Sequence, residues 1–287
     1  MYSNEVLSPT SLAEALAIKD QYGGEIYPLA GGTDVLIMVR NKLGVWGESP
    51  PLLNLNRIPD LDFIQETEKT IEIGPLVTHT ELLESPIMAK FVPTLIKAVS
   101  IIGSPQIRNL GTLIGNMCRA SPAADTLATL YARDTQVEIQ SVNDLQMVPI
   151  SEFITDPGQI KIPENGLVTK IIIPKLQGYI GDYISLRQRY ALSIVVVSIA
   201  VEALLSENNK KIEDIRISLG AVAPTIVRAN KTENFLKSNA FTKDSIEQSE
   251  KIVMEECKPI TDIRSNERYR KAMTGVVLGR ILRSFLK

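Results

Sequence analysis

Apolar and polar positions recur with two different spacings along the chain, and each change of spacing marks a change of element. Apolar residues three and four positions apart, from Leu12 to Ile18, predict a helix, with Ser8, Thr10 and Ser11 as candidate caps and Gly23-Gly24 at its end. A short apolar run over 26–30 predicts a strand. This strand leads into two adjacent glycines, so we expect a helix, a strand and then a tight turn.

Alternation with a period of two predicts most of the strands that follow. The strands and hairpins expected from it cover 51–56, 61–74, 136–150 and 166–174. Helical spacing occurs instead over 81–103, where two prolines interrupt it, and over 126–134. The first part of the chain therefore combines short strands with short helices.

Long strands begin at about residue 178. The stretch 181–224 contains apolar and alternating runs joined by the polar turn "SENNKK", which predicts an antiparallel meander. Helices follow, and the last is expected over 266–285. We place a domain boundary near 175–180, which divides the chain into domains 1–177 and 178–287.

Composition limits the chemistry that the chain can carry alone. It has two cysteines, one histidine and a net charge of −2. These numbers are too small for a disulfide framework, a Cys₄ zinc site or an iron–sulfur cluster, so any metal redox centre must sit on another chain. They also suggest a cytoplasmic protein without a nucleic-acid partner. No secretory leader is apparent, and the apolar stretch 191–205 contains Glu202, which favours a buried strand over a membrane span.

Two glycine-containing loops are the strongest candidates for ligand binding. The first is Gly31-Gly32 with Thr33 and Asp34, and the second covers 109–125. Neither matches the Rossmann or Walker pattern. Glycine lets the backbone approach a ligand closely, and clustered backbone amides bind anions without lysine. We therefore expect the two loops to hold a diphosphate from two sides.

The carboxylates of these loops need a different explanation, because an anion beside a phosphate is repelled. Asp34 is expected to cap the element that follows it. Asp125 is expected to accept hydrogen bonds from ligand hydroxyls. The competing interpretation is that Gly31-Gly32 forms a tight turn with no ligand.

Together the two loops carry a family resemblance. The segments "LAGGTDVL" and "RNLGTLIGNMCRASPAAD" resemble those of the FAD-binding subunit of molybdenum hydroxylases, of the xanthine, carbon monoxide and nicotinate dehydrogenase type. The segments "SPTSLAEALAI", "IGPLVTHTEL" and "ISLGAVAPTIVRA" also fit. The resemblance runs from Leu7 to about Leu286.

This resemblance implies a fold and a set of partners. The fold is α+β, with a two-lobed FAD-binding domain of the vanillyl-alcohol oxidase/MurB (PCMH) type and a smaller domain with an antiparallel sheet and helices. FAD is expected on this chain, 2Fe-2S clusters on a small subunit, and the molybdenum cofactor on a large subunit. Electrons would pass from the clusters to FAD and then to NAD, a quinone, ferredoxin or oxygen. The assembly implied is a dimer of heterotrimers.

The resemblance also implies which residues contact the cofactor. The first loop would lie along the FAD pyrophosphate, the second loop near the diphosphate and the adenosine end, and a basic residue near the flavin. These residues are Leu29, Ala30, Gly31, Gly32, Thr33, Asp34, Val35, Ile102, Gly103, Thr112, Gly115, Asn116, Ala124, Asp125, Leu167, Val168 and Arg187. One departure stands out, since Ile114 occupies a position where the commoner form of the loop has glycine.

Several points stay open at the level of sequence. No catalytic acid or base can be chosen, and His79 is better explained as a histidine bonded to a nearby turn than as a proton shuttle. No role is assigned to Cys118 or Arg119. Tyr190 is a candidate either for the flavin or for an interface or core position, and Trp46 is a candidate for a surface or partner contact. The alternatives are a stand-alone flavoenzyme of the same fold, with Cys118 as the candidate for covalent attachment, and an interaction protein without cofactor.

Overall fold

The chain folds around three main β-sheets. The structure, a computed structural model, describes residues 5–40, 50–189, 192–207 and 209–286. The first sheet has three parallel strands in the order β1-β3-β2. Its strands are β1 (Val6–Leu7), β2 (Tyr27–Leu29) and β3 (Leu52–Asn54). Helix α1 (Leu12–Tyr22) covers it with Ala15 and Leu16, and Gly23 ends that helix in the left-handed conformation that favours glycine.

The second sheet is antiparallel and forms the centre of the first part of the chain. Its five strands follow the order β4-β5-β10-β6-β7. They are β4 (Ile64–Glu66), β5 (Thr70–Ile73), β10 (Leu167–Pro174), β6 (Gln136–Gln140) and β7 (Leu145–Pro149). The hairpins predicted over 61–74 and 136–150 are confirmed as β4–β5 and β6–β7. A two-stranded ribbon of β8 (Ile154–Asp156) and β9 (Gln159–Ile160) adjoins them and was not predicted.

Short helices cover this sheet, and prolines help to divide the stretch 79–108 into several of them. Pro86 and Pro93 stand at the first positions of two of these helices, where a proline is tolerated. The helices are α3 (His79–Glu84), α4 (Pro86–Phe91), α5 (Pro93–Ser100), α6 (Pro105–Arg108), α7 (Leu113–Cys118), α8 (Asp125–Ala132) and α9 (Ile150–Phe153). Helix α7 corrects the sequence analysis, which treated 109–125 as one loop, and α6, directly before that stretch, was not predicted. The apolar side chains of Leu113, Ile114 and Met117 face the core and explain why α7 forms there.

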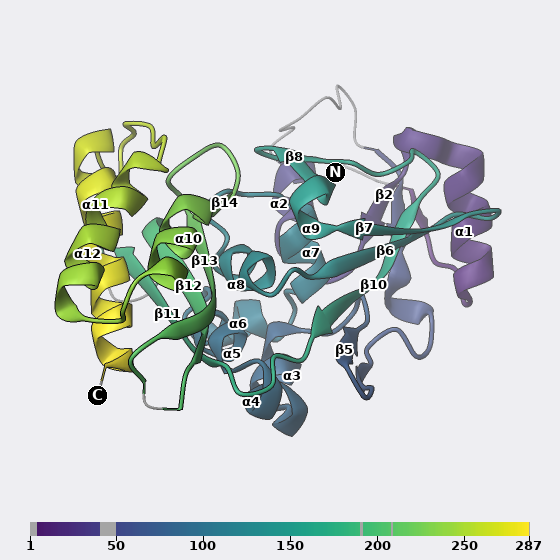
Figure 1. Cartoon of the computed structure of the whole chain (residues 1–287). Helices are drawn as coiled ribbons and strands as arrows, with labels where there is room; N and C mark the ends of the chain where they lie inside the picture. Colours follow the sequence, from purple (N-terminus) through teal and green to yellow (C-terminus); the bar gives the residue numbers. More distant parts are fainter. Residues whose placement is uncertain (1–4, 41–49, 190–191, 208, 287) are drawn as a thin grey trace.

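The C-terminal part is an antiparallel sheet with helices on one face (Figure 1). Its strands are β11 (Ile180–Arg187), β12 (Val195–Leu205), β13 (Ile212–Gly220) and β14 (Val227–Arg228). Its helices are α10 (Asn230–Ser238), α11 (Lys243–Glu255) and α12 (Glu267–Phe285). The predicted meander and last helix are therefore confirmed. The buried Arg270 of α12, which donates to the carbonyl oxygens of Val196 and Ala221, was not predicted from the helical pattern.

Helix α8 lies between the two halves of the chain. Leu127 and Leu130 pack into the core of the five-stranded sheet, whereas Ala128 and Ala132 pack against Ala200 of β12. The small alanine side chains let α8 approach the C-terminal sheet closely. This contact places both ends of α8 within reach of charged residues on that sheet.

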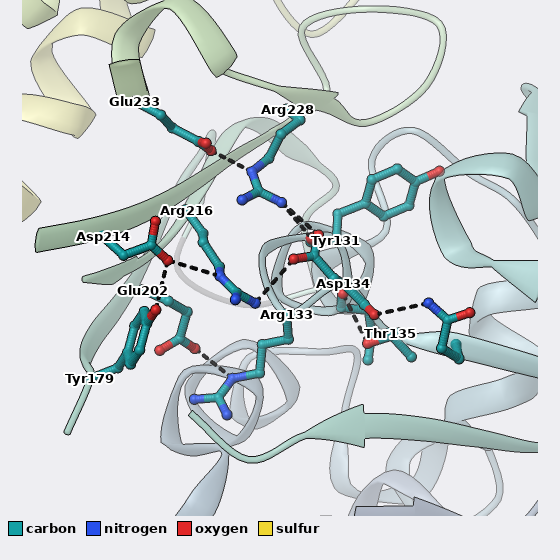
Figure 2. Close-up of polar contacts among 12 residues, drawn as sticks. Tyr131, Arg133, Asp134, Thr135, Tyr179, Glu202, Asp214, Arg216, Arg228 and Glu233 are labelled. Atoms are coloured by element: carbon teal, nitrogen blue, oxygen red, sulfur yellow. Dashed lines mark hydrogen bonds and ion pairs between the residues drawn. The ribbon is translucent and has the colours of Figure 1, made fainter. Parts of the chain in front are cut away.

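The C-terminal end of α8 is tied to the sheet by ion pairs (Figure 2). Arg133 donates to the carboxylate of Glu202 at 2.7 Å, and both side chains are at most 3% exposed. Asp134 accepts from Arg216 of β13 at 3.0 Å and from Arg228 of β14 at 2.7 Å. Removing one partner of a buried ion pair strongly destabilises a protein, because the other charge is left buried and unpaired. Arg133 and Glu202 therefore fix the position of α8 on the sheet.

No helix among the described residues is both long enough and apolar enough to cross a membrane. Within the apolar stretch 191–205, for which a buried strand was predicted, β12 covers Val195–Leu205, and Val195 to Ala203 are buried.

Candidate functional site

The first loop leaves the parallel sheet where β2 ends. Gly31 and Gly32 follow Leu29, and α2 (Val35–Arg40) begins immediately after Asp34. Gly32 has a φ of 70°, a backbone conformation that glycine adopts without steric cost. The N–H of Leu36 donates to the carbonyl oxygen of Gly32 at 3.2 Å. The glycine pair therefore reverses the chain between a strand and a helix within a few residues.

Two side chains outside the predicted set hold this loop. The Asn56 amide donates to the carbonyl oxygen of Ala30 at 2.9 Å. Arg119 pairs with the Asp34 carboxylate at 2.5 Å. Asp34 stands directly before α2, and its carbonyl oxygen accepts from the N–H groups of Ile37 and Met38. That its side chain also caps the helix stays a prediction, since the partner of the carboxylate among the described residues is Arg119. The ion pair neutralises a carboxylate that would otherwise repel an anion at the loop.

The second loop packs directly on the first. A Cβ atom placed on Gly31 would lie 1.8 Å from the carbonyl oxygen of Leu110, and one placed on Gly111 would lie 3.4 Å from Oγ1 of Thr33. The first of these distances is far below a van der Waals contact, so only glycine fits at position 31. The two loops that the sequence places far apart thus touch through their backbones.

A third segment, Val77 to Thr80, fixes the second loop from its other side. The N–H of His79 donates to the carbonyl oxygen of Gly111 at 2.9 Å. The N–H of Leu113 donates to the carbonyl oxygen of Val77 at 3.1 Å, and Thr80 donates to the Asn109 side chain at 2.6 Å. Gly111 is therefore enclosed between Thr33 of the first loop and His79 of this segment.

The imidazole of His79 is buried beneath the second loop. Its side chain lies 3.3 Å from the position that a Cβ on Gly111 would take, and the residue is 2% exposed. Burial, with a smaller contribution from nearby Arg108, lowers the pKa of His79 to about 4. The imidazole is consequently neutral at pH 7, which disfavours proton transfer. Its buried Nδ1 atom has no hydrogen-bond partner among the described residues, so the bond to a nearby turn that the sequence suggested is not found at that atom.

The predicted contacts of the second loop fall at the start of α7. The Thr112 side chain caps this helix by accepting from the N–H of Gly115 at 3.1 Å. The Oδ1 atom of Asn116 accepts from Thr126 at 2.5 Å. Ile114 lies in the helix with its side chain in the core, and its φ is not in the left-handed region. The departure from the family pattern at this position is accommodated, because no glycine conformation is needed there.

Residues just before the second loop are held by a similar turn. Gly103 has a φ of 51°, and a Cβ there would lie 2.9 Å from Cγ2 of Ile107. Arg108 donates to the carbonyl oxygen of Ile102 at 2.8 Å. Ile102 and Gly103 therefore form a turn before α6, and Arg108 at the end of that helix ties this turn to the start of the second loop.

Asp125 and Arg187 meet each other where α8 touches the C-terminal sheet. The Asp125 carboxylate accepts from Arg187 and, at 2.6 Å, from the hydroxyl of Tyr183. Ala124, the residue before α8, is buried. Burial raises the pKa of Asp125, while the bonds from Arg187 and Tyr183 act in the opposite direction.

The remaining predicted residues have buried side chains. Leu167 and Val168 begin β10, and their side chains belong to the cores on the two sides of that strand. Val35 is buried at the start of α2. Only the backbone of these residues is available to a ligand.

Other candidates carry less information. Cys118 ends α7, and burial raises the pKa of its thiol to about 12, so the reactive thiolate is disfavoured. Tyr190 and Trp46 lie outside the described residues.

The loop backbones provide the donors that a diphosphate needs. The N–H groups of Gly31, Gly32, Thr33 and Asp34 have no acceptor among the residues that the structure describes. Clustered amides without partners are suited to an anion. The geometry thus fits the phosphate-bearing part of a dinucleotide.

The missed residues contact the loops in two ways. Asn56 and Tyr183 act on the loops from other elements, so no local motif contains them, whereas Arg119 lies in the second loop itself but pairs with a residue of the first. Only Asn56 left a trace in the sequence, because it follows the strand next to β2 and polar residues at neighbouring ends of parallel strands converge.

Comparison with known proteins gives the family. The profile described as "FAD binding domain in molybdopterin dehydrogenase" matches residues 2–176, and that of the "CO dehydrogenase flavoprotein C-terminal domain" matches residues 183–285. The chain belongs to the molybdopterin dehydrogenase FAD-binding family. It is therefore an FAD-binding subunit of the molybdenum hydroxylase type, and the expected α+β fold is confirmed.

Relatives agree over almost the whole chain. The carbon monoxide dehydrogenase medium chain of Hydrogenophaga pseudoflava is 29% identical, covering 97% of this chain and 95% of the relative. The nicotinate dehydrogenase FAD-subunit of Eubacterium barkeri is 30% identical over 67% of this chain and 66% of its own. A solved carbon monoxide dehydrogenase from Hydrogenophaga pseudoflava superposes with a TM-score of 0.92 at 29% identity, over 100% of this chain and 98% of the other.

The contact between the loops predicts the effect of adding one methyl group. In Gly31→Ala the new Cβ would meet the Leu110 carbonyl, so the loops must separate. We expect a loss of about 1–3 kcal/mol in the free energy of unfolding and weaker FAD binding by more than about tenfold. Isothermal titration with FAD and urea unfolding measure these two effects.

The control is Gly24→Ala, where a Cβ has only ordinary contacts at 3.8 Å. It should change the free energy of unfolding by less than about 0.5 kcal/mol and leave FAD binding intact. Full FAD affinity in Gly31→Ala would contradict the proposed packing of the loops.

The buried neutral His79 predicts a pH dependence of stability. The unfolded chain takes up a proton near pH 6.5, whereas the folded chain does so only near pH 4. Stability is therefore lost as the pH falls through this window. We expect the wild type to lose about 2 kcal/mol more than His79→Leu between pH 7.5 and pH 5.

Urea unfolding of both proteins at the two pH values measures this difference. The other titrating groups are the same in both proteins, so their contributions cancel in the comparison. The chain has no second histidine that could titrate in this pH window. Parallel pH profiles of the two proteins would show that His79 is not buried in the neutral form.

Proposed function

We propose that this chain carries FAD non-covalently and transfers electrons within a multi-subunit molybdenum hydroxylase. Electrons would come from 2Fe-2S clusters on a small partner subunit and leave to an external acceptor such as NAD. The observation that carries the proposal is the contact between the two loops at Gly31 and Leu110. Beside it, the N–H groups of Gly31 to Asp34 have no acceptor in the part of the chain that the structure describes.

Different residues would hold different parts of the cofactor. The amides of Gly31 to Asp34 would donate to the diphosphate, and Arg119 would keep Asp34 from repelling it. The start of α7, with Thr112 at its cap, would approach the same diphosphate from the second loop. Asp125 and Arg187 would contact the nucleoside and flavin portions. Bound FAD supplies the capacity to accept two electrons and pass them on.

The need for partner subunits follows from the ligands that this chain lacks. Two cysteines in the whole sequence cannot bind even one 2Fe-2S cluster with four thiolates. Among the described residues no group of three or more His, Cys, Asp or Glu is placed to hold a metal ion. The solved Cu,Mo-CO dehydrogenase, which is 25% identical with a TM-score of 0.92, supports an assembly that also contains a molybdenum centre.

The proposal also covers the domains of the chain and the assembly of the subunits. We propose a division into domains 1–177 and 178–287, which falls between the end of β10 at Pro174 and the start of β11 at Ile180. We also propose a dimer of heterotrimers, as in the family that the sequence resembles. A cytoplasmic location stays a prediction.

A stand-alone flavoenzyme with covalent FAD is the second candidate. Cys118 is the cysteine near a loop, but its raised pKa disfavours the thiolate that such a bond requires. The structure therefore favours non-covalent binding.

The proposal predicts a specific spectroscopic result. The full chain, expressed alone and mixed with FAD, should gain flavin absorbance in a ratio of about one FAD per chain, since one pair of loops forms one site. Acid precipitation should then release all of the yellow colour into the supernatant.

A chain that takes up no FAD would refute the proposed function. A yellow precipitate would instead support covalent attachment. Purification from the native host adds the test of the assembly, because the chain should bring with it one subunit containing iron–sulfur clusters and one containing molybdenum.

A further inference from the structure

A buried hydroxyl group stands behind the predicted cofactor contacts at Asp125 and Arg187. Tyr183 lies on β11 with 1% of its surface exposed, and its hydroxyl donates to Oδ1 of Asp125 at 2.6 Å. Arg187, four residues along the same strand, donates to the same oxygen. One carboxylate oxygen therefore receives two donors from the C-terminal sheet.

Arg187 is itself held by further bonds. Its Nε donates to the Ser185 hydroxyl at 3.0 Å, and its Nη1 donates to the carbonyl oxygen of Ser193 at 2.5 Å. The side chains of Asp125 and Arg187 are each 10% exposed. Because the pair is largely removed from water, its geometry depends on how completely its hydrogen bonds are satisfied.

We infer that Tyr183 is a positioning residue, which holds the Asp125 carboxylate so that Asp125 and Arg187 are aligned for FAD. This inference rests on the proposed function. Tyr183 does not need to touch the cofactor, since it acts through Asp125. It would make the C-terminal sheet part of the cofactor site.

The rest of α8 supports this role for Tyr183. The C-terminal end of the helix is fixed by the buried pair of Arg133 with Glu202 and by the two arginines on Asp134 (Figure 2). The helix is therefore anchored to the sheet at that end whatever happens at Asp125. Loss of the Tyr183 hydroxyl should change the local arrangement of Asp125 while α8 stays docked.

The protonation states agree with this arrangement. Burial and the neighbouring Asp125 raise the pKa of Tyr183 well above its usual value, so its hydroxyl remains a donor across the working range. Among the described residues the charged and titratable groups that act on Asp125 are Arg187 and Tyr183, both on β11. Removing Tyr183 takes away a bond that favours the ionised carboxylate, so the pKa of Asp125 should rise further.

The chain offers a matched control on the same segment. Tyr179 donates its hydroxyl to the Asp214 carboxylate, also at 2.6 Å. Tyr179→Phe and Tyr183→Phe therefore delete the same kind of bond. Asp214 lies on β13 and is not among the proposed cofactor contacts.

Titration of the full-length chain with FAD at pH 7.5 tests the inference. Tyr183→Phe should raise the dissociation constant for FAD on the order of tenfold, whereas Tyr179→Phe should stay within about twofold of the wild type. Far-UV circular dichroism and thermal unfolding of the three apo proteins show whether each variant folds.

A pH series gives a readout that a merely structural defect would not produce. Binding that depends on ionised Asp125 weakens as the pH falls, and in Tyr183→Phe this weakening should begin at a higher pH than in the wild type. Tyr179→Phe should follow the wild-type profile.

Each outcome has one meaning. Wild-type affinity in Tyr183→Phe, or an equal loss in both variants, would overturn the positioning role. An unshifted pH profile in Tyr183→Phe would overturn it as well. If the wild-type chain itself takes up no FAD, the proposed function fails. The titration of the wild type alone therefore distinguishes this failure from a failure of the positioning role.

Discussion

The close approach of Gly31 to the Leu110 carbonyl is the constraint on which the candidate site depends. It brings together two loops that lie far apart in the sequence, and it is possible only because Gly31 has no Cβ. The parallel sheet positions the first loop at the end of β2, while Val77 to His79 hold the second loop through backbone bonds. Among the described residues the N–H groups of Gly31 to Asp34 in the first loop have no acceptor. The proposed binding capacity therefore arises from backbone geometry and not from a cluster of basic side chains.

The C-terminal sheet contributes to this site through α8. Charged pairs fix the C-terminal end of the helix, and Tyr183 and Arg187 donate hydrogen bonds to its first residue, Asp125. The sheet also holds the end of the second loop, because the N–H of Ala221 donates to the carbonyl oxygen of Pro122 at 2.8 Å. The two parts of the chain thus form one structural unit around the predicted cofactor contacts.

Much of the fold could be predicted from the sequence, since strand alternation and proline positions are local signals. The hairpins β4–β5 and β6–β7 and the helix α12 appear where the pattern places them. Helix α7 was missed because glycine and asparagine at positions 115 and 116 are typical of loops, whereas burial of Leu113, Ile114 and Met117 decides the helix. The partners of the loops were missed for a different reason. Arg119 on Asp34 and Tyr183 on Asp125 are contacts between elements, and no spacing along the chain encodes them.

The most direct test is a crystal structure of the full-length chain with FAD. The account predicts the diphosphate at the junction of the two loops, with its oxygens accepting from the N–H groups of Gly31 to Asp34, and with Gly31 still against the Leu110 carbonyl. FAD bound elsewhere on the chain, or a diphosphate without contact to these amides, would contradict it.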